Sequence, residues 1–208
     1  LDRWVDMCDR LGVKYFEIAH LFTQWGAGHA PKVMATVDGE YKKIFGWETD
    51  ASGPEYTEFL RTFIPQFLDF MKSKNGADKR CSFHISDEPT TEHLEQYTAS
   101  RAVVYDLLKD YPIMDALSDY DFYEKGLVQT PIVAVDHIDP FIEHNVDHLW
   151  CYYCVCQWDK VTNRFIAMPS ARTSIISTQL YKYNIEGFAQ WGYNFYYNQF
   201  SHGYVNPF

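Results

Sequence analysis

The sequence lacks the features that mark membrane-spanning and nucleic-acid-binding proteins. Its longest unbroken apolar run covers only residues 149–156, well short of the roughly 18 to 20 residues that cross a bilayer. Basic residues are few, since 18 Lys and Arg stand against 28 Asp and Glu, giving a net charge of −10. They form no cluster larger than pairs such as Lys42-Lys43. We therefore expect neither nucleic acid nor a membrane surface as a partner.

The usual signatures of nucleotide and metal sites are also missing. There is no GxGxxG motif, no Walker A loop and no HExxH motif, so nothing indicates a nucleotide-binding sheet or a zinc protease. Cys151, Cys154 and Cys156 lie in a run of strand-forming residues without a second Cys or His pair at zinc-finger spacing. We expect buried thiols, no metal and no cofactor. Because five cysteines are an odd number in a chain too large to need disulfides, free thiols in a reducing compartment are expected, which favours the cytoplasm.

The sequence is rich in aromatic residues, with 15 Phe, 16 Tyr and 6 Trp. Hydrophobic residues make up 47% of the chain, enough to bury the core of one compact domain. Strand-forming residues are concentrated in six segments, most of them near-continuous apolar runs that suit strands covered on both faces. These segments are residues 15–22, 81–86, 113–118, 132–136, 149–156 and 187–193.

Helical periodicity fills the intervals between these strands. Apolar spacing and end signals predict helices over residues 1–11, 52–71, 91–109 and 170–184, with short turns at 119–125 and 140–145. Strands alternating with helices form a parallel sheet with the helices outside. The predicted fold class is α/β, a (β/α)8 TIM-type barrel of which this segment supplies about six βα units. A doubly wound sheet would also fit. Residues 1–208 are then expected to be one barrel domain within a longer multidomain chain, with the first strands upstream.

The second predicted strand ends in two adjacent carboxylates, Asp87 and Glu88, followed by Pro89. Catalytic side chains of parallel barrels come from such strand ends. Neighbours on a regular strand point to opposite faces, so both carboxylates can reach one pocket only if the pleat breaks at Ser86 or Asp87, which Pro89 favours. Two crowded carboxylates do not both ionise easily, and glycosidic cleavage uses one acid and one anion. Alternatively, Asp87 caps the next helix and Glu88 is solvated.

The other predicted strand ends carry polar and aromatic residues. Sugars combine apolar ring faces with many hydroxyls, so a cleft of Trp, Tyr, Asp, His and Asn side chains suits them. We expect the substrate to contact Asp119, His137, Trp191, Tyr193 and Asn194. A metal held by histidines such as His20, His84 or His137 with a nearby aspartate is a further alternative, although the sequence has no His-x-His pair.

Four ordered segments carry a specific resemblance: residues 83–89 (FHISDEP), 112–119 (PIMDALSD), 163–170 (NRFIAMPS) and 187–194 (GFAQWGYN). Over nearly the whole chain the sequence resembles the DUF4091 domain, the catalytic barrel of glycoside hydrolase family 123. The resemblance implies a retaining exo-β-N-acetylhexosaminidase that releases N-acetylgalactosamine from glycans, without metal or cofactor. It also implies that Asp87 holds and polarises the 2-acetamido group of the substrate, whose carbonyl oxygen attacks the anomeric carbon to give an oxazoline. Glu88 would protonate the leaving oxygen and later activate water.

Three alternatives remain open at this stage. A retaining glycosidase with a direct nucleophile would need a second carboxylate, such as Asp119 or Asp136, roughly 5 Å from Glu88. A non-catalytic carbohydrate-binding barrel would keep the cleft without turnover. A metal-dependent hydrolase is the third. The expected partner is a glycan or amino-sugar substrate, and no oligomeric state follows from the sequence.

Overall fold

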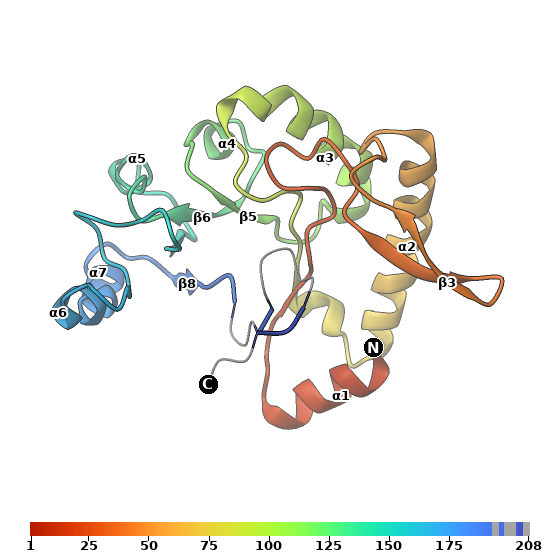
Figure 1. Ribbon diagram of the computed structural model, residues 1–208, viewed down its shortest axis with the longest axis horizontal. Helices are drawn as coiled ribbons and strands as arrows, with labels where there is room; N and C mark the ends of the chain where they lie inside the picture. Colours follow the sequence, from red (N-terminus) through yellow and green to blue (C-terminus); the bar gives the residue numbers. More distant parts are fainter. Residues whose placement is uncertain (193–195, 198–202, 206–208) are drawn as a thin grey trace.

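The computed structural model describes residues 1–192, 196–197 and 203–205 (Figure 1). Its parallel strands are β1 (Phe16–Glu17), β4 (Cys81–Ser82), β5 (Met114–Leu117), β6 (Thr130–Ala134), β7 (Trp150–Tyr152) and β8 (Gly187–Ala189). Strand β1 pairs with β4, and β5 to β8 form a four-stranded sheet in chain order. A parallel bridge between Phe83 and Ile113 joins the two parts. Each strand expected from the sequence is therefore present; β6 has the expected length but begins two residues earlier, and the other five strands are shorter than expected.

Helices follow the strands, as the sequence predicted. They are α1 (Asp2–Leu11), α2 (Pro54–Ser73), α3 (Leu94–Leu108), α4 (Asp121–Glu124), α5 (Asp139–Glu143), α6 (Ser170–Ser174) and α7 (Ile176–Lys182), with 3-10 turns η1 (Ala77–Arg80) and η2 (Thr91–His93). The expected single helix over residues 170–184 is wrong, because the chain divides there into α6 and α7. In this segment the Ser174 hydroxyl donates to the carbonyl of Ser170, a local bond that competes with a continuous helix.

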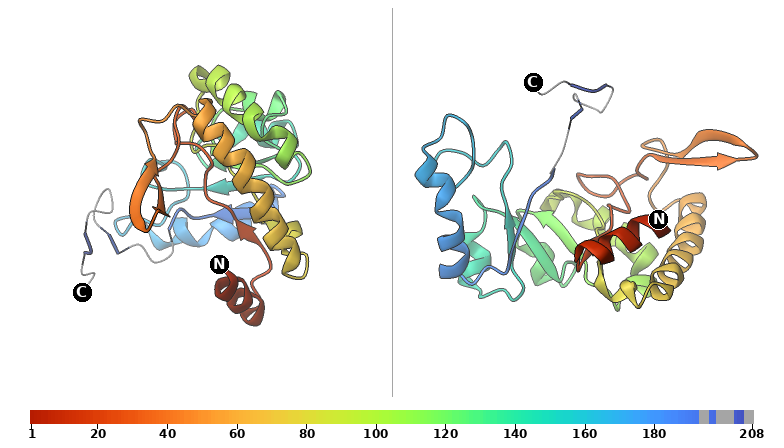
Figure 2. Two further views of the ribbon diagram at one scale, coloured as in Figure 1. Left: turned by 90° about the vertical axis from the view of Figure 1, so that its right-hand side faces the viewer. Right: turned by 90° about the horizontal axis from the view of Figure 1, so that it is seen from below.

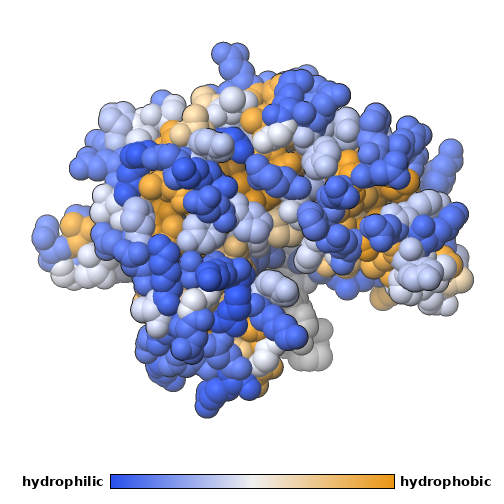
Figure 3. All heavy atoms as spheres, turned by 180° about the vertical axis from the view of Figure 1, so that it is seen from behind, coloured by the Kyte–Doolittle hydropathy of each residue, from blue (hydrophilic) through white to orange (hydrophobic). Residues whose placement is uncertain are grey.

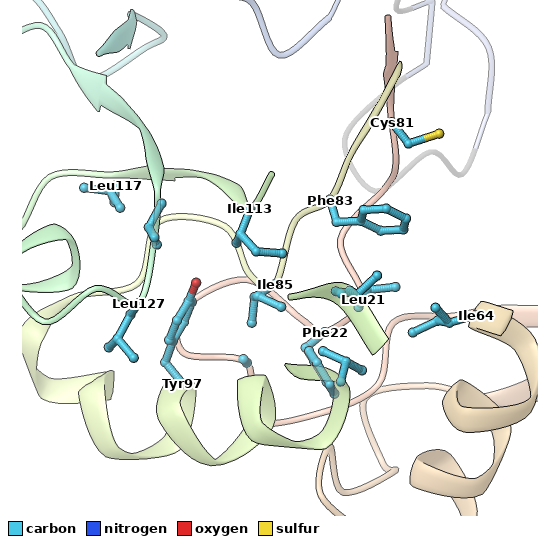
Figure 4. Close-up of a cluster of buried hydrophobic side chains, with 14 of the residues drawn as sticks. Leu21, Phe22, Ile64, Cys81, Phe83, Ile85, Tyr97, Ile113, Leu117 and Leu127 are labelled. Carbon is cyan, nitrogen blue, oxygen red and sulfur yellow. The ribbon is translucent and has the colours of Figure 1, made fainter. Parts of the chain in front are cut away.

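The two faces of the sheet have different neighbours. Along β5, Asp115 and Leu117 are fully buried, whereas Met114 and Ala116 point to the opposite face and are half-buried. Leu117 joins the main core between the strands and the helices, where Tyr97 of α3 and Ile64 of α2 also pack (Figure 4). The opposite face carries a smaller apolar cluster around Ile132, Ala134 and Tyr152. The helices thus cover one face and leave the other free to line a cavity.

An antiparallel hairpin follows β1 and was not anticipated. Its strands are β2 (Val33–Val37) and β3 (Glu40–Phe45), and it projects from the body of the molecule beyond α2 (Figure 2). Asp38 and Gly39 join the strands with φ of 53° and 85°, the paired positive values of a type I′ turn. Asp-Gly between strand formers was the sequence signal that could have revealed this hairpin.

The described residues do not form a closed barrel. Within them the parallel strands run from β1 at one edge to β8 at the other. The sequence predicted an eight-stranded barrel, and the observed parallel α/β sheet is consistent with part of such a barrel. The face opposite to that of Figure 1 is mainly hydrophilic with separated apolar patches (Figure 3). No helix in the described part of the chain is long and apolar enough to cross a membrane.

Candidate active site

A cavity of about 680 Å³ opens at the carboxyl ends of the parallel strands. Strand β7 contributes Trp150 and Tyr152, and the segment after β4 contributes Asp87 and Glu88. The other lining residues are Glu17, His20, His84, Ala116, Ile132, Cys154, Val155, Phe188, Ala189, Gln190 and Trp191. This is the end of a parallel sheet at which active sites are found. The cavity therefore combines three carboxylates, two histidines and several aromatic rings within one wall.

A local change of backbone direction brings Asp87 and Glu88 to the same cavity. Glu88 has a φ of 47°, in the left-handed region that residues other than glycine seldom adopt. The amide of Glu88 donates to the carbonyl of Ala116 at 2.9 Å, and the carbonyl of Asp87 accepts from the amide of Trp25 at 2.8 Å. The regular pleat is thus interrupted between Ile85 and Glu88, a segment that includes Ser86 and Asp87, where the sequence predicted a break. Strained backbone of this kind is concentrated at functional sites.

Burial and neighbouring charge perturb Asp87. Burial, followed by the nearby carboxylates of Glu88 and Asp115, raises the pKa of its carboxyl to about 6. The charge of His84 opposes these effects. A carboxyl with its pKa near 6 is poised to gain or lose a proton close to neutral pH, which is characteristic of catalytic acids and bases.

Glu88 is held by a tyrosine of the neighbouring strand. The hydroxyl of Tyr152 donates to Glu88 Oε1 at 2.5 Å. Burial, followed by the Glu88 carboxylate, raises the pKa of Tyr152 well above its ordinary value, so the phenol remains a proton donor at physiological pH. The bond fixes the direction of the carboxyl group through Oε1. In the described residues Oε2 has no comparable partner, which leaves it available to a substrate.

His84 connects the cavity with the core of the sheet. Its Nε2 lies 3.0 Å from Glu17 and its Nδ1 lies 3.4 Å from Asp115, with both contacts better described as ion pairs than as aligned hydrogen bonds. Burial alone would lower the pKa of His84, but the two carboxylates together raise it to about 9. Beside this cation, burial and the charge of His84 lower the pKa of His20. One histidine is therefore charged and the other neutral at pH 7.

The substrate contacts expected from the sequence are only partly brought together. Trp191 lines the cavity and is 65% exposed. Asp119 instead accepts the amide of Thr91 at 2.7 Å, and His137 is exposed and lies 3.0 Å from Asp136. Among the described residues, neither Asp119 nor His137 belongs to the cavity wall.

Tyr193 and Asn194 lie outside the described residues, so their expected contacts with substrate stay predictions. The sequence analysis also missed Trp150 and Tyr152. Their signal was the alternation of Trp150, Tyr152 and Cys154 along one face of the expected strand, all three of which line the cavity.

The polar groups of the cavity do not assemble into a metal site in the part of the chain that the structure describes. There, no group of three His, Cys, Asp or Glu side chains is arranged to hold a metal ion. All five cysteines are free thiols: Cys8, Cys81 and Cys151 are buried, Cys154 is half-buried and Cys156 is exposed.

Adjacent carboxylates beside aromatic rings in an open cavity are a combination suited to sugar chemistry. No curated protein matches the chain in sequence. A family model described as "Glycoside hydrolase 123, catalytic domain" matches residues 1–208. The chain therefore belongs to this family of glycoside hydrolases, enzymes that act on glycans.

Proposed function

We propose that this glycoside hydrolase is a retaining exo-β-N-acetylhexosaminidase that releases N-acetylgalactosamine with the help of the 2-acetamido group of the substrate. The observation that carries the proposal is the pair formed by Asp87 and Glu88, which share one cavity although they are neighbours in the chain. The side chain of Asp87 is partly buried and lies near other carboxylates, whereas the carboxylate of Glu88 accepts a hydrogen bond from the hydroxyl of Tyr152. The two neighbouring carboxyl groups therefore differ in their surroundings within one cavity.

Asp87 acts on the acetamido group in this mechanism. Its carboxylate accepts a hydrogen bond from the acetamido N–H and orients the acetamido oxygen towards the anomeric carbon. As that oxygen forms its bond to carbon and the glycosidic bond breaks, positive charge develops on the oxazolinium ring. The adjacent Asp87 anion stabilises this charge, and it does so strongly because the side chain is partly removed from water.

Glu88 is the general acid and then the general base. It donates its proton to the glycosidic oxygen as that oxygen leaves, and afterwards takes a proton from the water that opens the oxazoline at the anomeric carbon. The hydroxyl of Tyr152, on Oε1, keeps the carboxyl group in one orientation throughout. Two inversions at the same carbon give a product with the original anomeric configuration.

The cavity wall favours this mechanism over a direct carboxylate nucleophile. The described part of the wall contains neither Asp119 nor Asp136, the second carboxylates considered from the sequence. Its remaining carboxylate, Glu17, lies 3.0 Å from the charged ring of His84. With Glu17 paired in this way, the acetamido oxygen of the substrate is the better candidate for the nucleophile.

Aromatic side chains supply a surface for the sugar ring. Trp150, Tyr152 and Trp191 all line the cavity, and aromatic faces pack against the apolar faces of pyranose rings. We place the N-acetylgalactosamine ring against this group of side chains, with its anomeric carbon towards Glu88.

The test uses the full-length protein and the nitrophenyl β-glycosides of N-acetylgalactosamine and N-acetylglucosamine. We expect release of nitrophenol, faster from the galactosaminide, and a loss of at least about 100-fold in kcat for Asp87→Asn and for Glu88→Gln. A thiazoline that mimics the oxazoline should inhibit the wild type. Turnover without thiazoline inhibition would favour a direct nucleophile. Binding of the sugar with no product after long incubation would favour a non-catalytic carbohydrate-binding protein.

A further inference from the structure

We propose that Asp115 is the positioning residue for the catalytic pair: its buried carboxylate replaces part of the backbone pairing between β5 and the segment after β4, and so creates a one-residue bulge that turns Asp87 and Glu88 into the same cavity. The proposal deepens the function above and rests on the roles given there to Asp87 and Glu88.

The bulge follows from the register of the hydrogen bonds. The amide of Phe83 donates to the carbonyl of Pro112, and the amide of Met114 donates to the carbonyl of Phe83. An unbroken parallel ladder would next bring the amide of Ile85 to the carbonyl of Met114, and then the amide of residue 87 to that of Ala116. Instead it is the amide of Glu88 that reaches the carbonyl of Ala116, at 2.9 Å. One extra residue has therefore been accommodated before Glu88.

The side chain of Asp115 takes the amides that this bulge releases. Oδ1 accepts from the amide of Ile85 at 2.9 Å, and Oδ2 accepts from the amide of Ser86 at 3.3 Å. Ile85, Ser86 and Asp115 are each 0% exposed, so water cannot replace these bonds. A buried amide without a partner costs about 1–3 kcal/mol. The carboxylate of Asp115 thus supplies hydrogen-bond acceptors for both amides in the bulged arrangement.

Two further contacts hold Asp115 itself in place. The hydroxyl of Tyr97 on α3 donates to Oδ2 at 2.5 Å, and Figure 4 shows this hydroxyl directed from the helix towards the sheet. On the other side, Nδ1 of His84 lies 3.4 Å from Oδ1. Each carboxylate oxygen of Asp115 therefore has two partners: a backbone amide, and either the Tyr97 hydroxyl or the His84 ring. This accounts for a fully buried carboxylate inside a strand of apolar residues.

The bulge decides where the catalytic groups point. A shift of one residue along a strand moves each side chain to the opposite face. If the ladder resumed its regular register, Asp87 and Glu88 would alternate between the cavity and the helical layer. We therefore expect loss of the Asp115 carboxylate to displace the pair by an ångström or more, which can cost about 100-fold in rate.

The first arm of the test measures hydrogen exchange at single amides of the full-length protein and does not depend on activity. In the wild type, the amides of Ile85 and Ser86 should exchange at least about 100-fold more slowly than unprotected amides, although they are outside the strand ladder. Exchange of these two amides at unprotected rates would overturn the proposal, and this readout requires no variant to fold.

Asp115→Asn keeps the shape of the side chain but puts a donor where an acceptor is needed. The matched control is Asp78→Asn, because Asp78 is also buried and also receives a tyrosine hydroxyl, that of Tyr111 at 3.2 Å, but does not line the cavity. Protection at residues 85, 86 and 88 should fall by at least about 10-fold in Asp115→Asn and stay unchanged in Asp78→Asn. Unchanged protection in a folded Asp115→Asn protein would refute the bulge.

The second arm compares kinetics for substrates with good and poor leaving groups. We expect Asp115→Asn to lower kcat by about 100-fold with KM within about 3-fold, whereas Asp78→Asn keeps both near the wild-type values. The loss should be greater for a disaccharide than for a nitrophenyl glycoside, because a displaced acid matters most when the leaving oxygen needs a proton. A merely unstable variant would lose both activities equally, and that result, or an unchanged kcat, would refute the positioning role. An inactive wild type would refute the proposed function alone, because the exchange arm would still decide the role of Asp115 in the bulge.

Discussion

Asp87 should weaken the folded state at neutral and alkaline pH, because folding raises the pKa of its carboxyl from 3.8 to about 6. A carboxyl with the higher pKa in the folded state binds its proton more tightly there, so its contribution to stability is full below the unfolded pKa and is lost as the pH rises through 6. The difference of about 2.2 units corresponds to about 3 kcal/mol. Since the side chain is only partly buried, screening by water reduces this to about 1–2 kcal/mol.

Replacing Asp87 with Asn removes the ionisation and keeps the shape. We expect the free energy of unfolding, measured by urea titration, to rise by about 1–2 kcal/mol at about pH 8. Most of the gain should disappear at about pH 4, where the carboxyl is protonated in the folded state and partly protonated in the unfolded state. The same substitution should abolish activity on the mechanism proposed above. The protein would thus be more stable without the group that it needs for catalysis.

The control for this experiment is Asp69→Asn, since the Asp69 side chain is 79% exposed on α2. Its free energy of unfolding should change by less than about 0.5 kcal/mol at either pH. Glu88 contributes to the raised pKa of Asp87, so Asp87→Asn and Glu88→Gln each remove the same repulsion. The sum of their gains in the free energy of unfolding should therefore exceed the gain of the double variant. A variant Asp87→Asn that is no more stable than the wild type at about pH 8, or that gains equally at both pH values, would refute the reasoning.

Two further predictions concern the groups around the pair. His84→Gln removes a cation that lowers the pKa of Asp87. The rise of kcat/KM that accompanies ionisation of Asp87 should therefore move to higher pH by about 0.5–1 unit in a profile measured between about pH 4 and pH 8. An unshifted profile would contradict the electrostatic role of His84. Tyr152→Phe removes the hydroxyl on Glu88 Oε1 and should lower kcat by about 10-fold with little change in KM. Steady-state kinetics on a nitrophenyl glycoside test this, and an unchanged kcat would show that the hydroxyl does not orient the acid.

Much of the fold was predictable because the parallel strands are apolar on both faces. Such runs stand out in a sequence, and each of the six strands lies within or overlaps the segment expected for it. The hairpin of β2 and β3 was missed because its residues are only partly buried or exposed, so their hydrophobic pattern is weak. The division at Ile175 between α6 and α7 depends on local serine bonding, which apolar periodicity does not encode.

The candidate site was predictable to the extent that its chemistry is local. Asp87 and Glu88 are adjacent in the chain and follow β4 closely, so the roles proposed for them could be inferred from one short motif. The roles proposed for Tyr152 and Asp115 depend on contacts between segments far apart in the sequence. A carboxylate within an apolar strand was the available sign for Asp115, because a buried charge needs partners. Asp119 also lies at the end of an expected strand, but its side chain accepts a hydrogen bond from the amide of Thr91. Position at a strand end does not determine where a side chain points.

The bonds that hold the turn at Asp87 and Glu88 also bear on the order of folding. Ser86 Oγ bonds to the carbonyl of Thr23 across 63 residues, and the amide of Ile85 bonds to Asp115 across 30 residues. Contacts of such long sequence separation form after local helices, because the loops between them must first be closed. The turn at Asp87 and Glu88 therefore takes shape only once β1, β4 and β5 lie side by side. Recovery of catalytic activity during refolding is consequently expected only after these three strands have come together, whereas the helical signal is expected to recover earlier.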